Sequence, residues 1–227
     1  MKAKTVAVIQ ARMGSSRLPG KMLLSLKGEP LIKWVVERVK LSALVDELIV
    51  AIPNSEKDDL LYAYLKTLSV SVFRGSEENV LDRFYAAALQ ANATTVVRVC
   101  ADNPLIAPTE IDNLISFFTK HPCDYCYNHI PNKNKYPDGL GAEILSMELL
   151  SKIRREATSQ RNLEHCLTYI TDNPGDFKIE TFDPADIRLH HPEIKLDVDT
   201  LEDLQLLEQK NLTIHSDSIH ILNEFIN

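Results

Sequence analysis

Short apolar runs alternate with helical patterns through the first 120 residues of this chain. The runs are nearly free of charge and rich in β-branched residues, as in strands that are buried on both faces of a parallel sheet. They predict strands at Val6–Ile9, Leu48–Ile52, Val70–Phe73 and Thr94–Val99. Helical apolar stripes follow them, beginning near Pro30, Ser55, Val80 and Pro108. Four βα repeats predict an α/β fold with a doubly wound, mostly parallel sheet.

The regular repeat stops near residue 122. The middle of the chain favours helices over 147–157 and 163–171 and a strand over 177–182, separated by segments without clear periodicity. The repeat returns with a strand predicted over Ile194–Asp199, a helix after Thr200 and a closing helix over 217–225. We interpret residues 1–227 as one domain with an inserted subregion at about 122–190.

The first predicted strand leads directly into a cationic loop. Residues 12–21 hold three permanent cations, Arg12, Arg17 and Lys21, together with two glycines and two serines. Glycine lets the backbone approach a ligand, and open parallel sheets bind ligands at the carboxyl ends of their strands. The loop is therefore predicted to bind a polyphosphate. It has neither the Gly-Lys-Ser/Thr ending of the usual phosphate loop nor a dinucleotide fingerprint, so the side chains must do more of the binding.

The composition limits the partners of this loop. The chain of 227 residues has a formal charge of −7, which argues against a nucleic-acid-binding surface. The apolar run after Met1 is too short for a signal peptide or a membrane span, so we expect a cytoplasmic protein with no membrane partner. A reducing compartment would keep the four cysteines as thiols.

One cysteine cluster offers an alternative to idle thiols. His121, Cys123, Cys126 and His129 place four soft ligands in nine residues, a content that can hold zinc. Tetrahedral zinc sites usually draw their ligands from separated knuckles rather than from one run, which favours plain thiols.

Carboxylates follow two other predicted strands. Asp102 comes just after Thr94–Val99, and Asp197 and Asp199 end the strand predicted from Ile194. Each could be a turn or strand-end residue by itself. Alternation, however, places Asp197 and Asp199 on one side of their strand, where like charges repel unless a cation compensates them. Because Mg²⁺ binds one or two carboxylates together with phosphates, these residues predict a magnesium–nucleotide site with Asp102, Asp197 and Asp199 as metal ligands.

These motifs carry a resemblance to a known family. The segment IQARMGSSRLPGKML, Ile9 to Leu23, resembles the opening motif of nucleotidyltransferases that activate acidic sugars, which include the synthetases of CMP-sialic acid and CMP-ketodeoxyoctulosonate. The spore-coat-polysaccharide-type cytidylyltransferases are the most similar branch. Ala101–Leu105 and Asp197–Leu204 are similar to the two metal motifs of that family. The resemblance implies a Rossmann-like, glycosyltransferase-A-like sheet, Mg²⁺ as cofactor and a homodimer built by an arm within 122–165.

The resemblance also implies roles for individual residues. The implied catalytic residues are Arg12, Lys21, Asp102 and Asp199. The implied nucleotide-binding residues are Gln10, Ala11, Arg12, Gly14, Ser15, Ser16, Arg17, Lys21, Arg74 and Arg98. The acceptor is expected to contact Asp138, Glu143, Glu164 and His165.

The sequence departs from the family pattern in two places. Some relatives carry glutamine where this chain has Cys100, a poor hydrogen-bonding group, which leaves the identity of the base open. Asn162 and Leu163 are inserted between the Arg and Glu of an Arg-Glu-His segment. Arg74 could equally be a surface cation, and His165 could be structural.

Together these features predict a Mg²⁺-dependent nucleotidyltransferase. It would transfer a nucleoside monophosphate, with CTP as the expected donor, to an acidic sugar or related phosphorylated acceptor in surface polysaccharide or glycan biosynthesis, releasing pyrophosphate. A nucleotide-sugar-dependent glycosyltransferase is the first alternative, although such enzymes do not need a cationic loop after the first strand. A non-catalytic nucleotide-binding module is the second.

Overall fold

A seven-stranded sheet runs through the protein, for which a computed structural model describes residues 3–226. In spatial order its strands are β5 (Ser71–Gly75), β4 (Glu47–Pro53), β1 (Thr5–Gln10), β6 (Thr95–Cys100), β8 (Glu143–Ser146), β7 (Tyr125–Tyr127) and β9 (Ile179–Thr181). Neighbouring strands are parallel except at β8, which runs antiparallel to both β6 and β7. The predicted mostly parallel sheet is confirmed.

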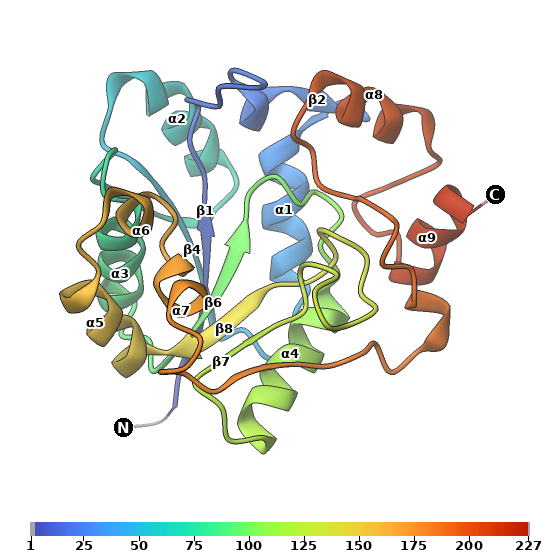
Figure 1. Ribbon diagram of the computed structural model, residues 1–227. Helices are drawn as coiled ribbons and strands as arrows, with labels where there is room; N and C mark the ends of the chain where they lie inside the picture. The colour runs from blue at the N-terminus through green and yellow to red at the C-terminus, as the bar shows by residue number, and fades with distance from the viewer. Residues whose placement is uncertain (1–2, 227) are drawn as a thin grey trace.

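Helices cover both faces of this sheet (Figure 1). One face packs against α1 (Leu31–Lys40), α2 (Asp59–Thr67) and α4 (Pro108–Lys120), and the same hydrophobic core extends beyond the sheet to α8 (Leu201–Gln209) and α9 (Ser218–Ile226). The other packs against α3 (Val80–Gln90), α5 (Met147–Glu156), α6 (Gln160–Glu164) and α7 (Thr168–Asp172). Three 3₁₀ segments lie at Lys21–Leu23, Glu56–Asp58 and Ile187–Leu189, and a small hairpin pairs β2 (Ser25–Leu26) with β3 (Glu29–Pro30). No helix within residues 3–226 is long and apolar enough to cross a membrane.

The position of β1 inside the sheet explains why Val6, Ala7, Val8 and Ile9 are all apolar. Ala7 and Ile9 pack into the core beneath α1 and α4, whereas Val6 and Val8 pack into the core beneath α3. All four side chains are fully buried. Since β4 and β6 pair with β1 on its two sides, every backbone group of the strand is also enclosed in the sheet.

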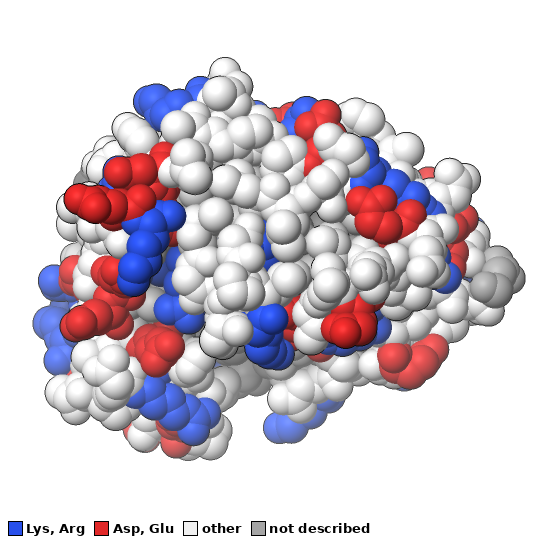
Figure 2. All heavy atoms as spheres, turned by 90° about the horizontal axis from the view of Figure 1, so that it is seen from above, with Lys and Arg blue, Asp and Glu red and all other residues white. Residues whose placement is uncertain are grey.

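The carboxyl ends of the parallel strands meet at one edge of the sheet. This edge is at the top of Figure 1, where the loop after β1 and the start of α8 also lie. Figure 2 looks onto it and shows Lys and Arg side chains intermixed with Asp and Glu around the rim. The positive charge of the first loop is therefore set within a mixed surface.

The strand predicted over Ile194–Asp199 is wrong as part of the sheet. Within residues 3–226 the segment makes a single bridge, between Lys195 and Asp138, although Leu196 and Val198 alternate into the core as expected. Its backbone instead bonds to two loops, because Val198 N–H donates to the carbonyl of Asp102 and Leu196 N–H donates to that of Asp138. At its end, Thr200 and Asp203 form a capping box at the start of α8, the helix predicted after Thr200.

The helix predicted over 147–157 and the strand predicted over 177–182 are confirmed as α5 and β9, but the rest of the middle of the chain differs from its prediction. Residues 122–190 supply β7, β8 and β9 to the main sheet, so this subregion completes the fold of the domain. The helix predicted over 163–171 is two short helices, α6 and α7, tied together by the buried amide of Asn162, which donates to Thr168 and Asp172. The homodimer that this subregion is expected to build stays a prediction, which light scattering at micromolar concentration would test.

Gly139 allows the loop of Asp138 to lie against the segment from Ile194, and its substitution provides a test of this arrangement. Its φ is +86°, and a Cβ added there would lie 2.9 Å from the backbone nitrogen of Asp197. We expect Gly139→Ala to lower the free energy of unfolding by about 1–3 kcal/mol in urea denaturation, since both the conformation and the space exclude a side chain. Gly175→Ala, where no atom lies within 4 Å of the added Cβ, is the control and should change stability by less than about 0.5 kcal/mol. Equal effects of the two substitutions would contradict this account.

Candidate active site

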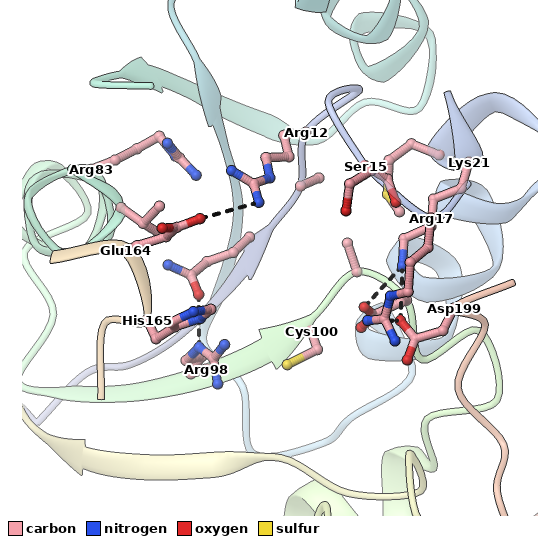
Figure 3. A pocket seen from close by; sticks show the side chains of 17 residues that line it. Arg12, Ser15, Arg17, Lys21, Arg83, Arg98, Cys100, Glu164, His165 and Asp199 are labelled. Atoms are coloured by element: carbon pink, nitrogen blue, oxygen red, sulfur yellow. Dashed lines mark hydrogen bonds and ion pairs between the residues drawn. The ribbon is translucent and has the colours of Figure 1, made fainter. Parts of the chain in front are cut away.

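A cavity of about 340 Å³ opens beside the carboxyl ends of β1 and β6 (Figure 3). Most of the residues singled out from the sequence line it: Gln10, Ala11, Arg12, Ser15, Ser16, Arg17, Lys21, Arg98, Asp102, Glu164, His165 and Asp199. They come from segments that are far apart in the chain, namely the first loop, β6 and its loop, α6 and the segment before α8. The fold thus brings the cationic loop and both carboxylate motifs to one place.

The loop after β1 is held in shape by its own backbone and by a buried carboxylate. Met13 N–H donates to Asp58, at 2.8 Å, and Met13 O accepts from Gly20 N–H. Burial raises the pKa of Asp58, which is 2% exposed. Gly20 takes a φ of +72° just before the 3₁₀ turn that begins at Lys21, a conformation that favours glycine. This turn directs Lys21 toward the ends of the other strands.

Lys21 joins the two carboxylate motifs. Its Nζ lies 3.1 Å from Asp102 Oδ2 and 3.6 Å from Asp199 Oδ1, and donates to the carbonyl of Val198 at 2.9 Å. Arg17 adds a second cation, 2.7 Å from Asp199 Oδ1. Lys21 is only 8% exposed, so the two carboxylates compensate a largely buried charge. Two negative and two positive side chains therefore meet at one point of the cavity.

The two carboxylates fit a magnesium ion that is bound together with phosphates. Asp102 and Asp199 contact the same nitrogen, so they lie close enough to share one cation. Within residues 3–226, no group of three or more His, Cys, Asp or Glu side chains is arranged to hold a metal ion unaided. Two carboxylates are enough for Mg²⁺, because this ion takes one or two carboxylates and completes its shell with substrate phosphates and water. The residues His121, Cys123, Cys126 and His129 do not form such a group within residues 3–226.

The role of Asp197 as a metal ligand stays a prediction. Asp197 is not among the residues that line the cavity, although Lys195 lies within 4 Å of both Asp197 and Asp199. Its carboxylate points toward Lys195, at 3.6 Å, and its buried Oδ1 makes no hydrogen bond within residues 3–226. Burial raises the pKa of Asp197 to about 6, against the opposing charge of Lys195. Burial likewise raises the pKa of Asp138, which is not among the lining residues. The alternation that put Asp197 and Asp199 on one side of a strand does not bring both to the cavity.

Arg74 and Glu143 also lie outside the lining of the cavity. Arg74 turns toward α2, where it donates to the carbonyl of Ser55, pairs with Asp59 at 2.7 Å and lies over the ring of Tyr62. Glu143 is 4% exposed and forms an ion pair with Arg98. Gly14 belongs to the loop but does not line the cavity. The expected ligand contacts of these residues stay predictions.

Arg98 is held by a buried polar chain. Its Nε donates to Gln10 Oε1 at 2.7 Å, while its guanidinium pairs with Glu143, which also accepts from the hydroxyl of Tyr125. Burial opposes the charge of Arg98, but Cys100 and Glu143 raise its pKa above the usual value. Burial also opposes ionisation of Glu143, whereas Arg98 and His129 lower its pKa. Arg98 and Glu143 are thus both charged, and each holds the other in position.

Arg83 is a lining residue that the sequence reasoning missed. It lies on α3, is 2% exposed and donates to the carbonyl of Ser76. Within residues 3–226 no carboxylate lies within 4 Å of it, and burial lowers its pKa to about 10. Its position could have revealed it, because a charged residue among Val80, Phe84 and Ala87 interrupts an apolar helix face. Val80, Met22, Cys100 and Ala101 complete the lining.

Comparisons with known proteins agree with this geometry. The family profile described as cytidylyltransferase matches residues 6–219. The chain belongs to the cytidylyltransferase family. An uncharacterised protein of Methanocaldococcus jannaschii is 35% identical over 218 residues, covering 96% of this chain and 86% of that protein. The spore coat polysaccharide biosynthesis protein SpsF of Bacillus subtilis is 36% identical over 206 residues, covering 88% of this chain and 83% of that protein.

Solved structures of cytidylyltransferases share the fold. A cytidylyltransferase of Leptospira borgpetersenii superposes with a TM-score of 0.88 at 28% identity, covering 97% of this chain and 93% of that one. The CMP:2-keto-3-deoxy-manno-octonic acid synthetase complexed with CTP superposes with a TM-score of 0.67 at 22% identity, covering 91% of this chain and 98% of that one. The Rossmann-like sheet expected for this cytidylyltransferase family member is therefore present.

Proposed function

We propose that this member of the cytidylyltransferase family is a Mg²⁺-dependent enzyme that transfers CMP from CTP to an acidic sugar and releases pyrophosphate. The contact of Lys21 with both Asp102 and Asp199 carries the proposal, because it unites a phosphate-binding loop with a pair of metal-binding carboxylates. A glycosyltransferase would have no need of the three cations of this loop. We propose that the reaction takes place in the cytoplasm and serves the synthesis of a surface polysaccharide.

The names of relatives support the class of acceptor. A 3-deoxy-manno-octulosonate cytidylyltransferase of Bdellovibrio bacteriovorus is 38% identical over 121 residues, which cover 52% of this chain and 47% of that protein. Its named substrate is an acidic sugar, and the Bacillus subtilis relative is named for polysaccharide biosynthesis. His165 lines the cavity away from Lys21 and is available to contact such an acceptor.

The chemistry follows from the charges of the cavity. A hydroxyl oxygen of the acceptor forms a bond to the α-phosphorus of CTP, the bond from that phosphorus to the bridging oxygen breaks, and pyrophosphate leaves as the hydroxyl loses its proton. Arg12, Arg17 and Lys21 bind the phosphates and neutralise their charge. Asp102 and Asp199 would hold Mg²⁺, which supplies further stabilisation of phosphate charge when bound. The protein contributes position and electrostatics rather than a covalent intermediate.

A substrate screen tests the proposed reaction. The four nucleoside triphosphates are combined with sugar acids, sugar phosphates and small phosphorylated acids, and pyrophosphate release is followed with Mg²⁺ or with EDTA. We expect turnover only with CTP and an acidic sugar, and only with the metal present. Preference for ATP or GTP, or undiminished turnover in EDTA, would contradict the assignment.

Substitution of the two carboxylates tests whether they act as one unit. Asp102→Asn and Asp199→Asn should each remove most turnover, and the double variant should lose little more, because groups that act through one metal ion are not additive. Asp186→Asn, which neutralises an exposed carboxylate paired with Arg188, is the control and should leave turnover unchanged. Thermal unfolding confirms that each variant is folded. Losses that multiply in the double variant would show that the two carboxylates do not share a metal ion.

A further inference from the structure

The wall of the cavity opposite Lys21 carries hydrogen-bond donors that lack acceptors. Gln10 ends β1, and its buried Nε2 makes no hydrogen bond within the described residues 3–226. Arg83 on α3 is buried too, and its Nε is likewise unpaired in this part of the chain. A buried donor left unpaired costs free energy, so a ligand that supplies acceptors here would recover that free energy on binding.

The orientation of the Gln10 amide is fixed by its neighbours. Arg98 Nε donates to Gln10 Oε1 at 2.7 Å, and the thiol of Cys166 lies 3.4 Å from the same oxygen. A flipped amide would place its NH₂ group against the N–H of Arg98, donor against donor. Because Glu143 in turn fixes Arg98, Gln10 can offer only its NH₂ donors to a ligand.

Glu164 adds an acceptor to the same wall. It lies on α6, which packs beside α3, and its carboxylate is 3.8 Å from Arg12 and 43% exposed. Figure 3 shows Arg83, Arg12 and Glu164 on one side of the cavity, away from Arg17, Lys21 and Asp199. The wall therefore presents two groups that only donate, Gln10 and Arg83, and one that only accepts, Glu164. Val80 and Cys100 supply less polar surface nearby.

We propose that Gln10, Arg83 and Glu164 read the base of the nucleotide and select cytosine over uracil. Cytosine presents two acceptors, O2 and N3, beside a 4-amino donor, which matches two donating side chains and one carboxylate. Uracil presents a donor at N3, which would face the donor of Gln10. It presents an acceptor at O4, which would face the acceptor of Glu164. This inference rests on the proposed use of a cytidine nucleotide. The carboxylate of an acidic sugar fits the wall less well, because Glu164 would repel it.

The consequence is a specificity that does not depend on Arg74 or on residue 100. Arg74 turns away from the cavity, and Cys100 is a weak hydrogen-bonding group. A site built to hydrogen-bond one edge rejects an isostere with the opposite pattern, because buried polar groups are then left unpaired. Discrimination between CTP and UTP is accordingly expected to reside in the pair Gln10 and Glu164.

Equilibrium binding measures this selectivity without knowledge of the acceptor. Calorimetry with MgCl₂ and either CTP or UTP is carried out on the full chain and on Gln10→Leu, Glu164→Gln and Gln90→Leu. The last places the same substitution on the exposed end of α3 as a matched control. We expect the unmodified protein to bind CTP at least about tenfold more tightly than UTP, as one or more lost hydrogen bonds imply. Gln10→Leu should weaken CTP about tenfold with little change for UTP, and Glu164→Gln should strengthen UTP relative to CTP.

Three results would overturn the base-reading role. They are equal affinity of the unmodified protein for CTP and UTP, equal weakening of both nucleotides in Gln10→Leu, and a change of selectivity in Gln90→Leu. Thermal unfolding of each variant separates lost binding from lost folding, and Glu164→Gln, on the surface of α6, tests the role even where Gln10→Leu does not fold. Selective binding of CTP without pyrophosphate release from any acceptor would support the base-reading role while contradicting the proposed reaction.

Discussion

The ammonium group of Lys21 is the interaction on which the rest of the site depends. It lies between Asp102, at the end of β6, and Asp199, before α8, while its own backbone belongs to the loop after β1. A cation this deeply buried is stable only because both carboxylates and the carbonyl of Val198 surround it. The same carboxylates repel each other less because the cation is there. The charges of Lys21, Asp102 and Asp199 thus hold three segments of the chain together. A magnesium–triphosphate complex also carries charges of both signs, which can pair with these side chains.

Hydrogen bonds between loops support this meeting of charges. Val198 N–H donates to the carbonyl of Asp102, so the backbone joins the two carboxylate segments independently of their side chains. A second buried network runs from Tyr125 through Glu143 and Arg98 to Gln10. Because each charged member of that network has an opposite partner, the network fixes orientation at the other wall of the cavity. One end of the cavity is organised by ion pairs and the other by directed hydrogen bonds.

Some site residues could be predicted and others could not, for physical reasons. Arg12, Arg17 and Lys21 crowd into one loop after a buried strand, and such a concentration is visible without coordinates. Arg83 occupies an ordinary helical position, and only the packing of α3 beside the cavity makes it part of the wall. Arg74 follows a strand just as Arg12 does, yet Asp59 and the carbonyl of Ser55 draw it toward α2. The partners of a side chain, rather than its place after a strand, decide whether the side chain reaches the cavity.

The sequence by itself determined the βα repeats, the buried central strands, the cationic loop and the two carboxylate motifs, because hydrophobic periodicity and local composition express them directly. It also determined the capping box of Thr200 and Asp203, whose partners are three residues apart. Only the tertiary structure decided that the segment from Ile194 bonds to loops instead of joining the sheet, that Asp199 but not Asp197 is among the lining residues, and that Gln10 Nε2 has no hydrogen-bond partner within residues 3–226. Each of these outcomes depends on contacts between residues that are distant in the chain. The local sequence pattern does not reveal such contacts.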